Sequence, residues 1–155
     1  MLARTRKTGF TLVEILIVVI ILGILAAIVI PQFTNASQDA RESSLLSQLQ
    51  TLRSQIELYK LQHRDQLPDL VTNWNPLTTK TNAAGGAAVD PNDTFGPYMQ
   101  SAPTNPVNTA SNVTNGDSAL AAAAVECGFI YDYAAGAGTG RIWGTATDKK
   151  TKFPE

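Results

Sequence analysis

Few side chains in this sequence could carry out bond-making chemistry. The 155-residue chain holds one cysteine, Cys127, and one histidine, His63, which together cannot supply a disulfide or the four ligands of a structural zinc site. The sequence has no HExxH, P-loop or GxSxG motif, so we expect no catalytic residues and a protein that is not an enzyme. We expect Cys127 to act as a small buried hydrophobic residue and His63 to be a solvated surface side chain.

Oxygen ligands for a metal ion come close together at one place in the sequence. Asp90 and Asp93 flank Pro91 and Asn92, and calcium takes oxygen ligands of this kind from loops. A turn with solvated carboxylates is the favoured interpretation, and a Ca²⁺ site at Asp90 and Asp93 is the alternative. We therefore expect no cofactor, with calcium as the one candidate.

A single acid, Glu14, stands inside a long apolar segment. The segment runs from Phe10 to Ile30, and Thr11, Glu14 and Gly23 interrupt its apolar residues. An unpaired carboxylate inside a bilayer costs about 2.5–3.5 kcal/mol on insertion scales, so such a residue usually has a partner. A carboxylate near the membrane surface that simply reaches water is the alternative interpretation.

The segment that carries Glu14 is long enough to cross a membrane. At about 1.5 Å per residue, a helix over residues 10–30 spans ~30 Å, which is the thickness of a bilayer's hydrocarbon core. The abundant Val and Ile would also suit a strand, but an open strand in lipid leaves backbone groups unpaired. Residues 1–9 carry Arg4, Arg6 and Lys7 and no acid, so the positive-inside rule predicts a cytoplasmic N-terminus and an exported remainder.

A cleaved secretory signal and a plain membrane anchor are two common interpretations of an N-terminal apolar segment, and neither accounts for all of its features. A cleaved secretory signal has an apolar core of roughly 7–15 residues before a small-residue cleavage site, whereas this run continues beyond Ala26 and Ala27. A plain single-pass anchor fits the length but leaves Glu14 unexplained.

The residues around Glu14 match a known motif, which consists of Gly9, Phe10, Thr11, Leu12, Val13 and Glu14. After a short basic leader and before a long apolar helix, this motif resembles the N-terminal signature of type IV prepilins, which type IV pilins share with the pseudopilins of type II secretion. The resemblance implies cleavage between Gly9 and Phe10 by a prepilin peptidase, N-methylation of Phe10, and assembly into a helical homo-oligomeric fibre. We interpret Glu14 as the partner of the Phe10 amine of a neighbouring subunit, a pairing that offsets desolvation and sets register.

The helical pattern continues through residues 31–67. Apolar residues spaced by four and three positions predict a buried face made of Leu45, Leu49, Leu52, Ile56 and Tyr59. Pro68 stops the pattern, because the residue before a proline avoids helical geometry. We predict one helix from about Phe10 to His63, bent near Pro31, and the resemblance implies that it loosens at Gly23 and Pro31 on assembly. A helix that ends at Pro31 and a heptad coiled coil are the alternatives.

Residues 68–155 are expected to form a small globular head. Residues 71–127 are rich in turn-forming residues and predict long loops, packed by Trp74, Phe95 and Tyr98, with a short helix over 118–126. Residues 128–145 predict an antiparallel hairpin with Phe129, Tyr131 and Tyr133 on one face, which we interpret as core or subunit contact rather than a ligand site. The predicted fold class is α+β and type IV pilin-like, with one long N-terminal helix packed on a small antiparallel β-sheet.

The nearly equal numbers of basic and acidic side chains exclude one functional class. Twelve basic and 13 acidic side chains argue against a protein that works by binding nucleic acid.

The head resembles that of major pseudopilins of type II secretion, at residues 96–99, at the prolines 103 and 106 and at residues 131–133. Type IV pilins usually carry a pair of cysteines near the C-terminus, and this chain has one. Major pseudopilins also hold calcium in the late loops of the head, but Asn105 stands where an acid is expected before Pro106.

The resemblance therefore implies a structural subunit of a type II secretion pseudopilus that drives protein export. It implies a single pass through the inner membrane with the N-terminus cytoplasmic and the head periplasmic. The expected partners are further copies of the chain, a prepilin peptidase, an inner-membrane assembly platform and other pseudopilins. Two alternatives stay open: a type IV pilin of a surface filament used for adhesion, motility or DNA uptake, and a membrane-anchored periplasmic binding module that does not polymerise.

Overall fold

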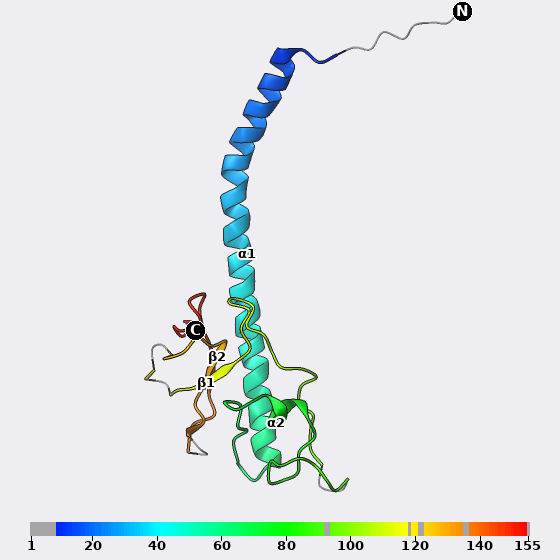
Figure 1. The fold of residues 1–155 in the computed structure, drawn as a ribbon, viewed down its shortest axis with the longest axis vertical. Helices are drawn as coiled ribbons and strands as arrows, with labels where there is room; N and C mark the ends of the chain where they lie inside the picture. Colours follow the sequence, from blue (N-terminus) through cyan, green and yellow to red (C-terminus); the bar gives the residue numbers. More distant parts are fainter. Residues whose placement is uncertain (1–8, 92–93, 118, 121–122, 135–136, 155) are drawn as a thin grey trace, which may run out of the picture. The chain divides into compact units, whose positions relative to one another are not determined.

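The structure is a computed structural model that describes residues 9–91, 94–117, 119–120, 123–134 and 137–154. The chain divides into two compact units, Met1–Asp39 and Ala40–Glu155. Its elements in chain order are α1 (Leu12–Gln62), α2 (Asn75–Thr78), β1 (Val113–Asn115), β2 (Phe129–Tyr131) and β3 (Ile142–Gly144) (Figure 1). One long helix and one small sheet make the α+β class that the sequence predicts.

Helix α1 has 51 residues and contains Pro31 in its interior. The prediction of a single long helix is therefore confirmed, and the alternative that the helix ends at Pro31 is wrong. Proline has no N–H, so the carbonyl of Ala27 loses the partner that a helix normally gives it. One turn later the hydroxyl of Thr34 donates to the carbonyl oxygens of Ile30 (3.2 Å) and Pro31 (2.8 Å). Such back-bonding often accompanies helix bending, and the bend near Pro31 stays a prediction.

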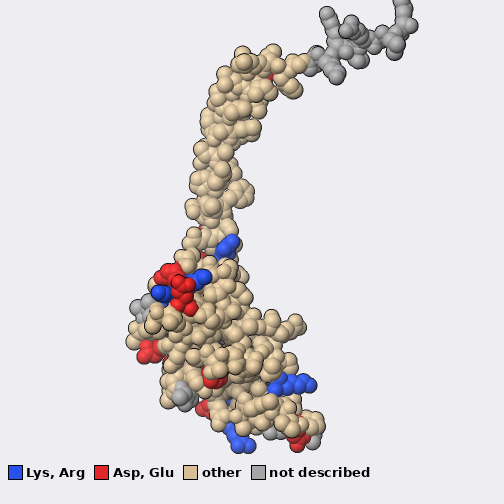
Figure 2. All heavy atoms as spheres, in the orientation of Figure 1, with Lys and Arg blue, Asp and Glu red and all other residues tan. Residues whose placement is uncertain are grey.

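In the described part of the first unit, residues 9–39, the apolar side chains are exposed. Every residue from Gly9 to Asp39 is exposed, and α1 is long and apolar enough by composition to cross a membrane. The residues from Leu12 to Ile30 include no Lys or Arg, and on the face drawn in Figure 2 the charged side chains gather over the second unit. An apolar surface this large is not stable in water, so lipid or other protein chains must cover it.

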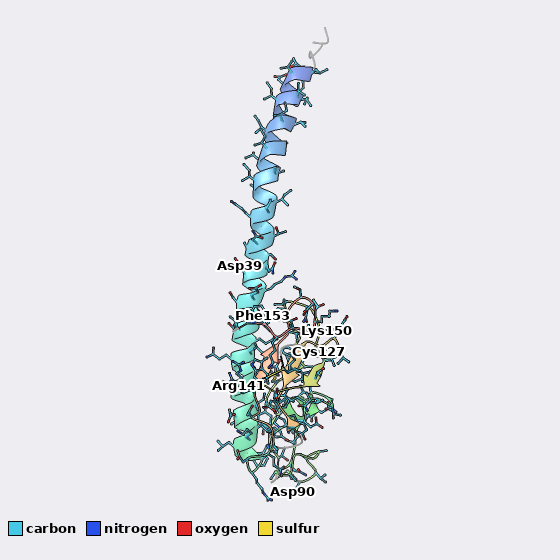
Figure 3. The ribbon with its side chains drawn as sticks, turned by 90° about the vertical axis from the view of Figure 1, so that its left-hand side faces the viewer. Asp39, Asp90, Cys127, Arg141, Lys150 and Phe153 are labelled. Carbon is cyan, nitrogen blue, oxygen red and sulfur yellow. The ribbon has the colours of Figure 1, made fainter. Side chains whose placement is uncertain are left out.

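The second unit buries the apolar face that the spacing predicts. Four side chains of α1 are at most 1% exposed: Leu45, Leu49, Leu52 and Ile56. Together with Tyr59 they form one core cluster with residues of the sheet, namely Phe129, Tyr131 and Ile142. The sheet and the loops lie on one side of this part of α1 (Figure 3). The head is therefore a sheet packed on one face of a helix.

The sheet has three strands in the order β1-β2-β3 and is mixed rather than antiparallel. Strand β2 pairs with β3 antiparallel, with Ile130 opposite Trp143, which confirms the predicted hairpin. Strand β1 pairs with β2 in parallel, with Thr114 opposite Ile130, so the expectation of an antiparallel sheet is wrong at this strand. A parallel pair needs a crossover of about a dozen residues, and residues 116–128 provide one.

The outer face of the sheet carries a second, smaller cluster. Because neighbouring residues of a strand point to opposite faces, Ile130 packs with Trp143, Cys127 and Ala123 away from α1. The ammonium group of Lys152 lies 3.9 Å from the ring centroid of Trp143, so the C-terminal segment covers this ring by a cation–π contact.

The short helix expected over 118–126 is absent from the described residues of that range, which exclude 118, 121 and 122. The backbone N–H groups of Ala123 and Cys127 donate instead to the carbonyl oxygens of Lys150 (2.8 Å) and Lys149 (2.7 Å). Pairing with the C-terminal segment thus uses the donors that a helix would have needed.

A fully buried asparagine joins the loops to the sheet. The side-chain nitrogen of Asn105 donates to the carbonyl oxygens of Gly128 (2.8 Å) and Thr145 (2.9 Å), and its Oδ1 accepts from the N–H of Val107 (2.9 Å). A carboxylate could accept the third bond but could not donate the first two. An asparagine at this position therefore makes bonds that an aspartate could not.

Replacing Asn105 by alanine should lower the free energy of unfolding by about 1–3 kcal/mol, because two buried carbonyls each lose one of their donors and the Val107 N–H loses the Asn105 oxygen. Asn112→Ala is the matched control: that side chain is exposed and donates to the carbonyl oxygen of Glu126 (2.7 Å), so the cost should stay within about 0.5 kcal/mol. Denaturant titration of the full chain in detergent micelles, followed by tryptophan fluorescence, measures both. Equal costs for the two variants would contradict the role given to Asn105.

Candidate functional site

The bond between Gly9 and Phe10 lies in accessible, non-helical backbone. Helix α1 begins at Leu12, both residues are exposed, and Phe10 is 83% exposed. A Cβ atom built on Gly9 would meet nothing within 4 Å. The chain itself therefore gives no steric reason for glycine at this position, whereas a protease that must bind the backbone closely would.

Thr11 and Glu14 together cap the start of α1. The carboxylate oxygen Oε2 of Glu14 accepts hydrogen bonds from the Thr11 N–H (2.8 Å) and the Thr11 hydroxyl (2.7 Å). The Thr11 hydroxyl in turn accepts a longer bond from the Glu14 N–H (3.3 Å). This reciprocal pattern is a capping box, and it satisfies backbone donors that the helix leaves without partners.

The capping box gives Glu14 a role that the sequence interpretation missed. The signal was present, because a threonine followed three residues later by a glutamate before an apolar run is the signature of this cap. An acid in the first helical turn is also favoured by the helix dipole. Within the described residues, both hydrogen bonds that the Glu14 carboxylate accepts in the cap are made by Oε2. The cap therefore does not use Oε1. Capping and pairing with a neighbour's amine are compatible.

Gly23 and Pro31 both lie inside α1 and are exposed. The space around Gly23 is open, with no atom within 4 Å of an added Cβ. Glycine and proline each weaken a helix interior, so these positions suit the loosening that the resemblance implies, which stays a prediction.

Of the two calcium candidates, Asp90 alone lies within the described residues, so the predicted site is not tested. Asp90 is exposed next to Pro91, and Asp93 lies outside the described residues. No group of three or more His, Cys, Asp or Glu side chains that could hold a metal ion occurs in the part of the chain that the structure describes.

The interpretation of His63 as a surface residue is wrong. Its ring is fully buried, stacks on the Tyr59 ring at a centroid distance of 3.7 Å, and contacts the ring of Phe95 edge-on. Nδ1 donates to the carbonyl oxygen of Tyr59 (2.8 Å), and Nε2 forms a hydrogen bond with the Thr81 hydroxyl (2.9 Å). His63 thus fastens a loop to the end of α1. Its partner Thr81 lies 18 positions away, and no local pattern predicts that pairing.

Cys127 and the aromatic stripe behave as the sequence predicts. Cys127 is fully buried, and burial raises the pKa of its thiol, which argues against a reactive thiolate. Phe129 and Tyr131 are fully buried, and the Tyr131 and Tyr133 rings stack at 6.2 Å. The stripe therefore belongs mainly to the core. Burial also raises the pKa of Tyr98, to about 12.

Comparison with known proteins points to the same N-terminal segment. The family described as "Prokaryotic N-terminal methylation motif" matches residues 4–30. This range contains Gly9, Phe10 and the whole capping box.

Whole-chain comparison gives relatives that share one description, type II secretion system core protein G. The protein of Pseudomonas aeruginosa is 34% identical over 109 residues, which cover 64% of this chain and 77% of the relative. That of Klebsiella michiganensis is 31% identical over 103 residues (66% of this chain, 70% of the relative). That of Aeromonas hydrophila is 32% identical over 81 residues, and the alignment spans 56% of its length and 52% of this chain. No solved structure matches the chain significantly.

Substituting Thr11 by alanine tests the cap. Loss of the hydroxyl should cost about 1 kcal/mol at the helix start and speed hydrogen exchange of the Glu14 amide about fivefold in detergent micelles. Thr11→Ser keeps the hydroxyl and should exchange like the unmodified chain. If the alanine and serine variants exchange at the same rate, Glu14 and Thr11 do not cap α1 in solution.

Proposed function

The chain belongs to the family of type II secretion system core protein G, and from this premise we propose how it is stored, processed and assembled. As a pseudopilin it is a structural subunit, anchored in the inner membrane by the apolar half of α1. The observation that carries the proposal is the exposed apolar surface from Leu12 to Ile30, which the chain does not bury and whose first turn is capped by Thr11 and Glu14.

Processing is proposed at the bond between Gly9 and Phe10. A prepilin peptidase on the cytoplasmic side would remove residues 1–9, and Phe10 would then be N-methylated. The basic leader supports a cytoplasmic N-terminus and a periplasmic head. The exposure of both residues ahead of α1 supports access of the peptidase.

Assembly is proposed to depend on the charge of Glu14. Cleavage creates an amino group at Phe10, at the edge of the bilayer, and Glu14 of an incoming subunit pairs with the Phe10 amine of its neighbour. Removing both charges from water is costly unless they meet, so the pairing sets one axial register between subunits.

Growth of the fibre is proposed to push secreted proteins through the outer membrane. An inner-membrane assembly platform would extract each subunit from the bilayer, and other pseudopilins would join the same fibre. The structural role is supported by the relatives, which are type II secretion system core proteins G.

Two variants at position 14 separate the charge from the cap. Glu14→Gln keeps an oxygen that can accept the Thr11 N–H but has no charge, whereas Glu14→Leu has neither. Both variants should insert and be processed, giving by intact mass a species that lacks residues 1–9 and carries one added methyl group. Both should lower fibre yield and protein secretion at least about tenfold, because a charge-assisted bond is lost.

The outcomes of this experiment are distinct. Normal fibres from Glu14→Gln alone would assign the loss in Glu14→Leu to the cap and refute the charge pairing. If the chain without substitutions is not cleaved between Gly9 and Phe10, the pseudopilin assignment is refuted in favour of a non-polymerising membrane anchor. Intact secretion with loss of surface filaments after gene deletion would favour a type IV pilin.

No resident metal is proposed for the turn at Asp90 and Asp93. Calcium takes about six to eight oxygen ligands, and this turn offers two carboxylates. Excess calcium should therefore leave the melting temperature of the full chain in detergent unchanged relative to a chelated sample. A clear rise that Asp90→Ala abolishes would establish a calcium site.

A further inference from the structure

A hollow of about 340 Å³, the Trp74 hollow, lies at the start of strand β1. Its lining includes three buried side chains, Leu70, Trp74 and Val113, which are at most 9% exposed and form an apolar floor. Exposed polar residues form the rim: Thr72, Asn73, Asn75, Ser111 and Asn112. An apolar floor with a few polar groups around it is the usual construction of a small-molecule site.

The floor of the Trp74 hollow is held in place by the contacts of its tryptophan. The indole Nε1 of Trp74 donates to the carbonyl oxygen of Ser111 (2.7 Å), and its ring meets the ring of Phe129 edge-on at a centroid distance of 5.7 Å. Trp74 also belongs to the core cluster of the head. A ligand would therefore meet a preformed surface, and little conformational entropy would be lost at the floor when it binds.

The amides of the rim keep hydrogen-bonding groups for a ligand. Oδ1 of Asn73 accepts from the Asn75 N–H (2.8 Å), and Nδ2 of Asn112 donates to the carbonyl oxygen of Glu126 (2.7 Å). Within the described residues, the other atom of each amide, Nδ2 of Asn73 and Oδ1 of Asn112, makes no hydrogen bond. The rim therefore offers both a donor and an acceptor.

A second hollow of about 300 Å³ shares a wall with the first. Thr72, Asn73 and Asn75 line both hollows. The second hollow also contains Asp69, whose carboxylate accepts from the N–H (3.1 Å) and the hydroxyl (2.8 Å) of Thr72. Two hollows that share a wall can hold neighbouring units of a chain-like ligand.

The lining of the two hollows disfavours an ion. Among the described residues that line them there is no Lys or Arg, and Asp69 is the one carboxylate. An anion would find no positive partner and would be repelled by Asp69, and a cation would meet no acid in the Trp74 hollow. The lining therefore selects a neutral ligand.

We propose that the Trp74 hollow and its neighbour form a binding site for a neutral oligosaccharide. A sugar ring has an apolar C–H face, which fits the buried floor, and hydroxyl groups at its edge, which both donate and accept hydrogen bonds and so match the rim. Neighbouring sugars occupy the two hollows. The site goes beyond the proposed function, and in the periplasm the same chemistry has two sources, the cell-wall glycan and free oligosaccharides.

The two tryptophans make the binding test internally controlled. In NMR spectra of the full chain, held in a detergent without a sugar headgroup, chitotetraose (a neutral tetramer of N-acetylglucosamine) should shift the indole N–H signal of Trp74. The signal of Trp143, which lies in the other apolar cluster, should stay in place. The expected dissociation constant is on the order of 1 mM, because the ligand is small and the hollow is open.

Three variants relate the shift to the Trp74 hollow. Ala102→Tyr, at an exposed residue of the lining, should fill the hollow and weaken binding at least about tenfold. Asn112→Ala removes one acceptor and should weaken binding about fivefold. Val89→Tyr, at a 92% exposed residue outside both hollows, should bind like the chain without substitutions. All three should keep the original melting temperature.

The outcomes separate the ligand classes and their sources. An unmoved Trp74 signal with both chitotetraose and maltotetraose would overturn the inference, as would equal affinity in Ala102→Tyr and Val89→Tyr. A shift caused by an uncharged hexapeptide and by neither sugar would overturn it in favour of a peptide site. Co-sedimentation with purified cell-wall glycan that Ala102→Tyr abolishes would assign the wall as the source, and binding of the soluble tetramers alone would assign free oligosaccharides. The assay needs no fibre, so its failure leaves the proposed function intact.

Discussion

The structure depends on one constraint: the chain cannot bury the apolar half of its own long helix. Every side chain from Leu12 to Ile30 is exposed, and the second unit builds its core from other residues. Removing that surface from water is the main driving force for both membrane residence and association. In the bilayer, lipid supplies the cover; in a fibre, other copies of the chain must supply it.

The second half of α1 meets the opposite requirement. It buries one face against the head, with leucines at the spacing of an amphipathic helix, and the contacts of Arg53 with the Ile142 carbonyl and of His63 with Thr81 join the two. Asn105 ties the loops to the strands, and His63 ties a loop to the end of the helix. These buried polar groups are fully used inside the head.

The sequence predicted the features that depend on local pattern. The apolar run, the spacing from Leu45 to Tyr59 and the alternation around Ile130 each determine a face without reference to distant residues. The sequence did not predict the features that depend on contacts between residues far apart in the chain. His63 is buried because a loop 18 positions away closes over it, and the parallel strand β1 lies in a stretch whose composition indicates only loop. The capping box of Thr11 and Glu14 is a local pattern, a threonine followed three residues later by a glutamate, and is predictable from the sequence.

Accessibility of a fluorescent label at Ile20 tests the exchange of lipid for protein most directly. In membranes, a quencher attached to lipid chains should reduce the label's emission, while a water-soluble quencher should not. In purified fibres, neither quencher should reach it, because neighbouring copies enclose the helix. Strong quenching from the aqueous phase in the fibre would contradict the account.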